Sequence, residues 1–194
     1  MGHQPSANYK CMRRSRLEEG LLSVEAVQPH HIEPIRQWRN AQMGILRQSA
    51  VVSPEEQEAY YRTHIWPDKR SLQPQNVLLA YLENDELIGY GGLVHVAWIH
   101  RRAEVSFLLK TELAAAQKDY SRYFSSFLRL MKILAFDDLG LERLFTETYV
   151  ERKRHIATLE ATGFRLEGVF RRHVWIGGRP VDSVFHGCLR TYER

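Results

Sequence analysis

The sequence predicts a single domain of the α/β (α+β) class, with a mixed, mostly antiparallel sheet of seven strands flanked by about four helices. Two patterns lead to this prediction. Three β-rich runs follow one another through residues 77–109 with only short turns between them, as in an antiparallel meander. Further along, apolar residues recur with helical spacing over residues 119–139, and strand and helix patterns then alternate.

The chain has 194 residues, which is enough for one sizeable core but not for two full domains. Residues 1–20 are polar and basic and have no apolar period, so we expect a flexible basic N-terminal arm followed by one domain over residues 21–194. Cys11 and Cys188 make no disulfide framework. With neither a secretory signal nor the roughly eighteen apolar residues of a membrane helix, we expect a cytoplasmic protein without a membrane partner.

The domain is expected to begin with a strand over residues 21–27, where apolar and polar residues alternate. A short helix follows over residues 29–40, in which Trp38 keeps helical spacing with earlier apolar residues and is interpreted as core. Ser53, followed by a proline and two glutamates, is typical of a helix start, so a second helix is predicted over residues 53–64.

The meander consists of a hairpin over residues 77–82 and 87–99 and a third strand over residues 103–109. Residues 89–92 (GYGG) look superficially like a phosphate-binding loop. They lie within a strand pattern and no helix follows them, so we expect a bulge or a close approach of two backbones instead.

The second half is predicted from the same kinds of pattern. The long apolar stripe predicts a helix over residues 119–139, ended by a glycine. A strand, a helix and a closing hairpin around a Gly-Gly turn follow. Their ranges are 144–149, 151–162, 164–176 and 181–189.

Three motifs in this order resemble the GNAT family of acetyl-CoA-dependent N-acetyltransferases. They are residues 102–108 (RAEVSFL), 139–144 (LGLERL) and 159–168 (LEATGFRLEG). The likeness covers about residues 21–189 and is similar to the branches that acetylate ribosomal-protein N-termini, small amines and amino sugars. It implies a GNAT-like domain, an N-acetyltransferase activity and acetyl-CoA as co-substrate.

The resemblance also implies which residues hold the coenzyme. Backbone groups of Phe107, Leu108 and Leu109 would bond the pantetheine arm and polarise the thioester carbonyl. Arg152 takes the position of an asparagine that contacts pantetheine. Both glycines of the family's pyrophosphate loop are absent from this sequence. The start of the helix remains, but its backbone N–H groups lose the close approach to the phosphates that glycine allows. The candidate phosphate ligands in that segment are Lys118, Tyr120, Ser121, Arg122 and Tyr123.

For catalysis, the resemblance favours Glu104 as the base that takes a proton from the amine, directly or through a water. The alternative is a solvent-facing glutamate paired with Arg101 or Arg102. Leu159 replaces the tyrosine that protonates the leaving sulfur in some members. His155, one turn from Arg152, is therefore the candidate acid, with Tyr149 as the second candidate.

The expected acceptor is a small-molecule primary amine. Residues 38–40 (WRN) resemble the subgroup that acetylates nucleotide-linked amino sugars, which assigns Arg39 and Asn40 to substrate binding and favours an amino sugar over a protein N-terminus. A protein N-terminal acetyltransferase stays open as an alternative. So does a catalytically drifted GNAT-fold binding module, such as an acyl-CoA sensor, because the loop glycines and the acid tyrosine are missing.

The remaining expectations concern partners. The net charge of +4 fits an anionic ligand but also fits many proteins that bind nothing charged. The nine histidines lack partners at ligand spacing, so no metal is expected. Basic pairs lie on different elements, so no nucleic acid is expected. A homodimer is compatible with this interpretation.

Overall fold

The computed structural model describes residues 6–116 and 119–193. Within these residues, eight strands form one open sheet in the order β1-β2-β3-β4-β5-β6-β8-β7. Neighbouring strands are antiparallel except for β5 and β6, which are parallel. The predicted fold class is confirmed, with one strand more than the seven expected.

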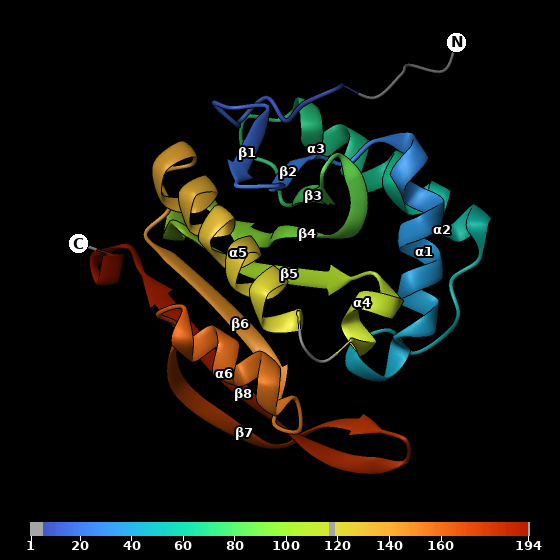
Figure 1. The fold of residues 1–194 in the computed structure, drawn as a ribbon, viewed down its shortest axis with the longest axis vertical. Coiled ribbons are helices and arrows are strands. Elements are labelled where there is room, and N and C mark those ends of the chain that lie inside the picture. The colour runs from blue at the N-terminus through green and yellow to red at the C-terminus, as the bar shows by residue number, and fades with distance from the viewer. Residues whose placement is uncertain (1–5, 117–118, 194) are drawn as a thin grey trace.

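The N-terminal half holds five strands and four of the helices (Figure 1). The strands are β1 (Arg16–Glu19), β2 (Leu22–Ala26), β3 (Val77–Glu83), β4 (Glu86–Ala97) and β5 (Arg102–Leu109). The helices are α1 (Ile32–Ala41), α2 (Pro54–Tyr60), α3 (Trp66–Arg70) and α4 (Thr111–Ala115). Ser53 caps α2 as expected, because its hydroxyl accepts from the Glu56 N–H while the Glu56 carboxylate accepts from the Ser53 N–H.

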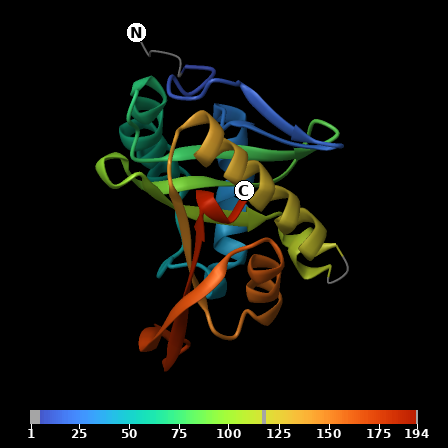
Figure 2. The same cartoon turned by 90° about the vertical axis from the view of Figure 1, so that its left-hand side faces the viewer.

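The C-terminal half follows the predicted order closely. Its elements are α5 (Tyr120–Lys132), β6 (Arg143–Tyr149), α6 (Lys153–Ala161), β7 (Arg165–Ile176) and β8 (Arg179–Leu189). Gly177 and Gly178 form the turn of the last hairpin with φ of +56° and +76°, a conformation that glycine adopts without strain. This hairpin extends away from the body of the molecule in two perpendicular views (Figures 1 and 2).

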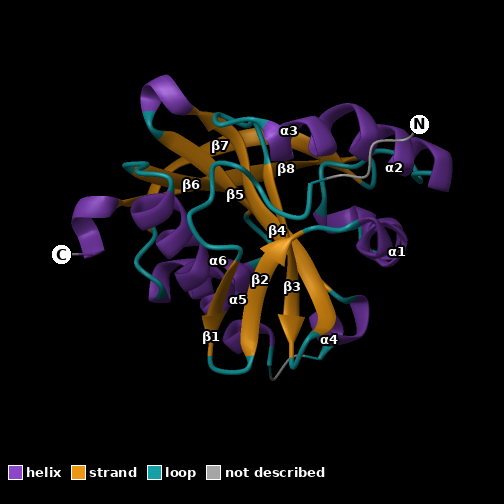
Figure 3. Cartoon of the chain, turned by 90° about the horizontal axis from the view of Figure 1, so that it is seen from above, coloured by secondary structure: helices purple, strands orange, loops and turns teal. Residues whose placement is uncertain are grey.

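The helices form two layers around the sheet (Figure 3). On one face, α5 supplies the largest share of the main core, including the fully buried Phe127 and Met131. On the other face, Ile35 and Trp38 of α1 pack with Tyr61, which directly follows α2. Trp38 is therefore a core residue, as expected.

In the part of residues 1–20 that the structure describes, the chain is folded, unlike the flexible arm that the sequence predicts. Residues Arg16–Glu19 form β1, which pairs with β2 and adds the eighth strand. Tyr9 is buried, with 1% of its surface exposed, and its hydroxyl accepts a hydrogen bond from the Leu78 N–H at 2.9 Å. A short strand and one isolated tyrosine give no sequence period, so their burial depends on contacts that only the folded chain makes.

The glycines at 89–92 allow a close approach of backbones, as predicted. A Cβ on Gly91 would lie 2.2 Å from the Ser106 carbonyl oxygen of β5. A Cβ on Gly92, whose φ is +138°, would lie 2.0 Å from the Val77 oxygen of β3. Side chains at these positions would force β4 away from its neighbours.

Strands β5 and β6 separate soon after they begin. Their pairing covers only Arg102 to Glu104 of β5 and Arg143 to Phe145 of β6. Beyond this point the rings of Phe107, Phe124 and His155 lie one on another, with centroids 4.7 Å apart for the first pair and 4.0 Å for the second. From Val105 onward, β5 pairs only with β4. A gap between two parallel strands is the feature that positions the site.

The burial of Tyr9 gives a first prediction. The substitution Tyr9→Phe should lower the free energy of unfolding by about 1–3 kcal/mol, because it leaves the buried Leu78 N–H without an acceptor. Urea unfolding measures the change. Tyr60→Phe, at a tyrosine that is 43% exposed, is the control and should stay within about 0.5 kcal/mol of the original chain. Equal stability of the Tyr9 variant would mean that this hydrogen bond adds nothing to the stability of the fold.

Candidate active site

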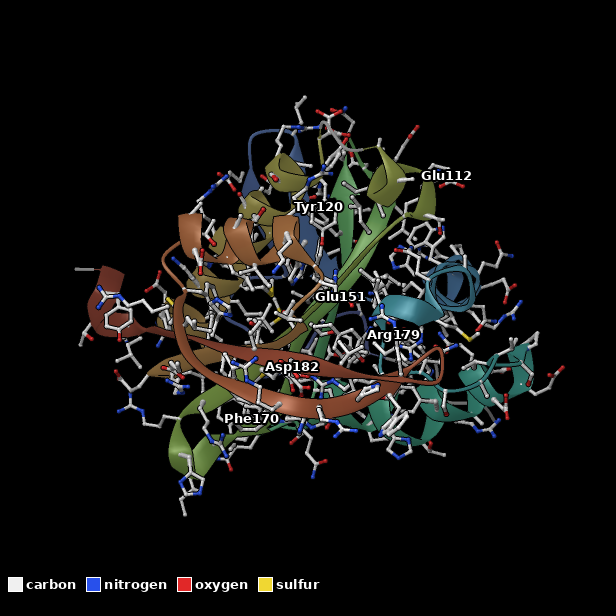
Figure 4. The ribbon with its side chains drawn as sticks, turned by 90° about the horizontal axis from the view of Figure 1, so that it is seen from below. Glu112, Tyr120, Glu151, Phe170, Arg179 and Asp182 are labelled. Carbon is white, nitrogen blue, oxygen red and sulfur yellow. The ribbon has the colours of Figure 1, made fainter. Side chains whose placement is uncertain are left out.

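One cavity lies in the gap between β5 and β6, and a second adjoins it. The adjoining cavity, of about 710 Å³, lies between the end of α1, α4 and the start of α6, and we call it the α4–α6 cavity. Tyr120 and Glu151, both labelled in Figure 4, line it. The cavity in the gap, of about 320 Å³, is the β5–β6 cavity and is lined by residues from both of these strands.

The two cavities share three lining residues, Ile45, Arg152 and His155. These residues therefore lie where a ligand in one cavity would meet a ligand in the other. Glu151, next to Arg152, forms a two-point ion pair with Arg179 of β8 at 2.6 and 2.9 Å, which fixes the chain as it enters α6 (Figure 4).

Two carboxylates face the β5–β6 cavity from adjacent strands. Glu104 of β5 and Glu147 of β6 are both largely buried, and Arg47 pairs closely with the first and lies 3.9 Å from the second. His95 Nε2 is 3.8 Å from Glu104. The predicted alternative, a solvent-facing Glu104 paired with Arg101 or Arg102, is wrong, because the strand turns this side chain inward and a loop arginine reaches it.

The structure separates the two predicted substrate residues. Arg39 lines the β5–β6 cavity, where it donates to the Tyr90 hydroxyl at 2.7 Å and to Gln48 at 3.1 Å. Asn40 instead holds the loop before α2, because its side chain bonds the backbone of Val52 through both of its polar atoms. Asn40 does not line either cavity.

His155 is buried where the two cavities meet. Its Nδ1 is 2.7 Å from the Tyr120 hydroxyl and 3.3 Å from the Arg152 guanidinium. Burial, together with the charge of Arg152 and nearby His186, lowers the pKa of His155 well below its usual range. The ring is therefore neutral at pH 7, and it carries no imidazolium proton to give.

Tyr149, the second predicted acid, ends β6 and lines the β5–β6 cavity. Burial raises the pKa of its phenol, while Arg47 acts against this rise. The predicted coenzyme residue Phe107 lines the same cavity, whereas the Leu108 and Leu109 side chains are core. The Leu109 carbonyl accepts from the Gln42 amide at 2.9 Å.

The predicted phosphate ligands at the start of α5 are dispersed. Tyr120 lines the α4–α6 cavity, but Arg122 and Tyr123 both bond Glu83 at the end of β3, at 3.0 and 2.8 Å. Ser121 accepts from the Thr158 hydroxyl at 3.1 Å. Lys118 lies outside the described residues.

Sequence reasoning overlooked a cationic helix start. Arg152, Lys153 and Arg154 line the α4–α6 cavity in succession, and the first turn of α6 holds no acidic residue. The positive end of the helix dipole adds to their charge, which suits an anion such as a phosphate. The signal was present in the sequence as the run RKR at the predicted start of a helix.

Two buried hydroxyl groups beside the β5–β6 cavity were also overlooked. Thr146 and Thr148 of β6 are almost fully buried, and their hydroxyl oxygens have no hydrogen-bond partner among the described residues. Their oxygens have almost no exposed surface, so they are unpaired polar groups in the wall of the cavity and do not face its interior. Alternate threonines on the inward face of LFTETY were the available signal.

Other kinds of site find no support in the described part of the chain. None of its His, Cys, Asp and Glu side chains gather in groups of three or more that could hold a metal ion. None of its helices is long and apolar enough to cross a membrane.

Comparison with known proteins identifies the family. A profile of the family described as an acetyltransferase (GNAT) domain matches residues 24–185, most of the chain. The chain belongs to the GNAT acetyltransferase family. Its motifs thus predicted the family correctly, and the predicted enzyme class, N-acetyltransferase, is that of the family.

Individual GNAT relatives are more distant. The uncharacterized N-acetyltransferase YoaA of Bacillus subtilis (strain 168) is 27% identical over 113 residues, or 57% of this chain and 60% of that protein. The chain thus spans about 60% of the length of this curated relative.

The crystal structure of spermidine N-acetyltransferase from Vibrio cholerae in complex with CoA and spermine is 21% identical, covers 91% of this chain and 100% of that one, and gives a TM-score of 0.80. A dodecameric structure of spermidine N-acetyltransferase from the same organism is 20% identical. It covers 90% of this chain and 97% of that one, with a TM-score of 0.74. These two structures have the same fold as this GNAT chain.

The neutral His155 gives a prediction about stability. As the pH falls from about 6.5 toward 5, the unfolded chain binds a proton at this histidine and the folded chain does not, so the free energy of unfolding should decrease, by at most about 1.4 kcal/mol per pH unit. Urea titrations at several pH values measure this slope. The variant His155→Gln should reduce it, and His100→Gln, at an exposed position, should leave it unchanged. Identical slopes for the original chain and His155→Gln would contradict a buried neutral ring.

Proposed function

We propose that this GNAT chain is an acetyl-CoA-dependent N-acetyltransferase that acetylates a primary amine of a small molecule. One observation carries the proposal. The unpaired edge of β5 lines the β5–β6 cavity, which holds two carboxylates and meets the cationic α4–α6 cavity at Ile45, Arg152 and His155. Such an arrangement suits an anionic acyl donor on one side and an amine on the other.

Acetyl-CoA supplies a thioester whose carbonyl an amine attacks. The edge of β5 from Val105 to Leu108 offers backbone groups to an extended pantetheine arm, as an added strand would, whereas the Leu109 carbonyl already accepts from Gln42. The side chains of Lys153 and Arg154 have no hydrogen bond or ion pair within the described residues, which leaves them available for phosphates. The cationic start of α6 offsets the missing glycines before α5.

Glu104 is the proposed base. It is buried beside Arg47, at the last residue of β5 that pairs with β6, where the gap begins. An ammonium group must lose a proton before it attacks, and holding a lysine-like amine neutral at pH 7 costs about 4 to 5 kcal/mol. Glu104 takes this proton directly or through a water, which contributes about 10² to 10⁴ in rate in enzymes.

The charges of the β5–β6 cavity favour an amino sugar over a polyamine as the acceptor. Three arginines, Arg39, Arg47 and Arg152, line it together with only two carboxylates, Glu104 and Glu147. A long polycation would meet net repulsion there. A single amine on a hydroxyl-bearing molecule brings only one positive charge and requires only one carboxylate.

A panel of acceptors tests this function. Purified protein is mixed with acetyl-CoA and either glucosamine, spermidine or a peptide with a free N-terminal alanine, and thiol release is followed. We expect glucosamine to give the fastest thiol release of the three acceptors. Tight coenzyme binding in calorimetry without release from any amine would support an acyl-CoA sensor instead. The absence of binding would support an interaction module.

The cationic start of α6 gives a prediction about coenzyme binding. The double variant Lys153→Ala and Arg154→Ala should raise the Kd for CoA about tenfold, equivalent to ~1.4 kcal/mol, because two charges facing the phosphates are lost. Calorimetry measures the change. The variant Arg62→Ala with Arg70→Ala removes the same charge away from both cavities and should bind like the original chain. If both double variants bound CoA equally weakly, the effect would come from the net charge of the protein and not from the position of these two residues.

The proposed base gives a prediction about turnover. Glu104→Gln should lower kcat by about 10²-fold at pH 7, because the amide cannot take a proton. Steady-state assays over a range of pH measure it. Glu142→Gln, at an exposed glutamate paired with Arg101, is the matched control and should keep full activity. Unchanged kcat of the Glu104 variant at every pH would remove this residue from the mechanism.

Two further expectations stay proposals. A homodimer is supported by the edge strand β7, which exposes Phe170 and Trp175 at 48% and 70% of their surface. A cytoplasmic location is supported by two cysteines that form no disulfide, Cys11 and the buried Cys188.

A further inference from the structure

Proton donation to the leaving sulfur has no obvious source on α6. Leu159 occupies the position of the tyrosine that serves this purpose in some GNAT members, and it is fully buried and has no proton to give. One turn earlier, His155 lines both cavities, but its ring is neutral. A neutral ring that gave up its one N–H without gaining another proton would become an anion.

The hydrogen bonds around His155 define its protonation. Arg152 lies 3.3 Å from both the Tyr120 oxygen and His155 Nδ1. Because a guanidinium group only donates, both of these atoms are acceptors toward it. The Tyr120 proton is thus assigned to the 2.7 Å bond to Nδ1, and the proton of the ring to Nε2. Nε2 has no hydrogen-bond partner among the described residues.

We propose that Tyr120 and His155 act as a coupled proton donor to the sulfur of coenzyme A as the acetyl group leaves. The inference rests on the proposed function and adds a step to it. Tyr120 lines only the α4–α6 cavity, whereas His155 lines both, so the ring connects the buried phenol with the junction where transfer occurs.

The step balances as follows in protons and electrons. The acceptor nitrogen bonds the acetyl carbon, and the carbon–sulfur bond breaks with its electron pair left on sulfur. His155 gives its Nε2 proton to that sulfur, and Tyr120 gives its phenol proton to Nδ1. The ring stays neutral and changes tautomer. The negative charge reaches the Tyr120 oxygen, 3.3 Å from the Arg152 guanidinium.

The resting state then returns through solvent. Nδ1 gives its proton back to the Tyr120 oxygen, and a water in the cavity supplies a proton to Nε2. The amine loses two protons through Glu104 to solvent, one before it attacks and one from the nitrogen of the adduct. One proton returns from solvent to Nε2, so the enzyme is restored and the reaction releases one proton overall. Burial raises the pKa of the Tyr120 phenol, and Arg152 opposes that rise.

Other groups near the ring are less suited to the role. Tyr149 lines only the β5–β6 cavity and makes no hydrogen bond to His155. Phe124 stacks on the ring at 4.0 Å and holds its plane. The hydrogen bonds to Tyr120 and Arg152 place Nδ1 on their side of the ring.

Kinetics of single and double variants test the coupling. The acceptor in these assays is whichever of glucosamine, spermidine and the peptide is acetylated fastest. Tyr120→Phe and His155→Gln should each lower kcat about 10²-fold with little change in KM for acetyl-CoA. The double variant should lose no more than either single variant, because the two groups act as one unit. Tyr192→Phe, whose ring packs on Arg165 far from both cavities, should match the original chain.

A spectroscopic readout does not depend on activity. Nitrogen-15 NMR of the histidine rings should give His155, assigned by its loss in His155→Gln, as the Nε2–H tautomer with a hydrogen-bonded Nδ1. Tyr120→Phe should shift that Nδ1 signal.

Three results would overturn the proposal: a Tyr120→Phe kcat within about threefold of the original, losses that multiply in the double variant, or a free Nδ1 in the original chain. A chain that acetylates none of the three amines would count against the proposed function, and the NMR result would still decide whether the pair exists.

Discussion

The early divergence of β5 and β6 is the constraint on which the site depends. Two parallel strands that paired to their ends would satisfy each other's backbone groups and leave no place for a ligand. Here the pairing stops at Glu104 and Phe145, and aromatic stacking between Phe107, Phe124 and His155 takes over the contact between the two halves. The β5–β6 cavity occupies this gap and meets the α4–α6 cavity at Arg152 and His155, so the architecture and the chemistry have one origin.

Local features of the fold were predictable because each has a local cause. The Ser53 cap, the Gly177–Gly178 turn and the apolar stripe of α5 are encoded by residues close together in the chain. The family motifs added the order of the strands. β1 and the buried Tyr9 escaped prediction because their stabilisation comes from β2 and Leu78, which no local period reveals.

The site was predictable in part for the same reason. Glu104 and His155 were identified by position in a motif, and both do line the gap. Their hydrogen-bond and ion-pair partners were not identified as such, because Arg47 comes from a loop and Tyr120 from another helix. Arg122 was expected to face a ligand, yet the folded chain pairs it with Glu83, a residue 39 positions away in sequence. Charge pairing over such distances is decided by tertiary structure.

Two of the three glycines of β4, Gly91 and Gly92, have a mechanical consequence for recognition. Gly91 lies opposite Phe107 and Gly92 opposite Ser106, directly behind the unpaired stretch of β5. With no side chain at either position, the three strands are held at close spacing just where the edge is open. The edge is therefore preorganised: its conformational entropy is lost when the chain folds, so a molecule that docks along it meets a rigid template and little further ordering opposes the association.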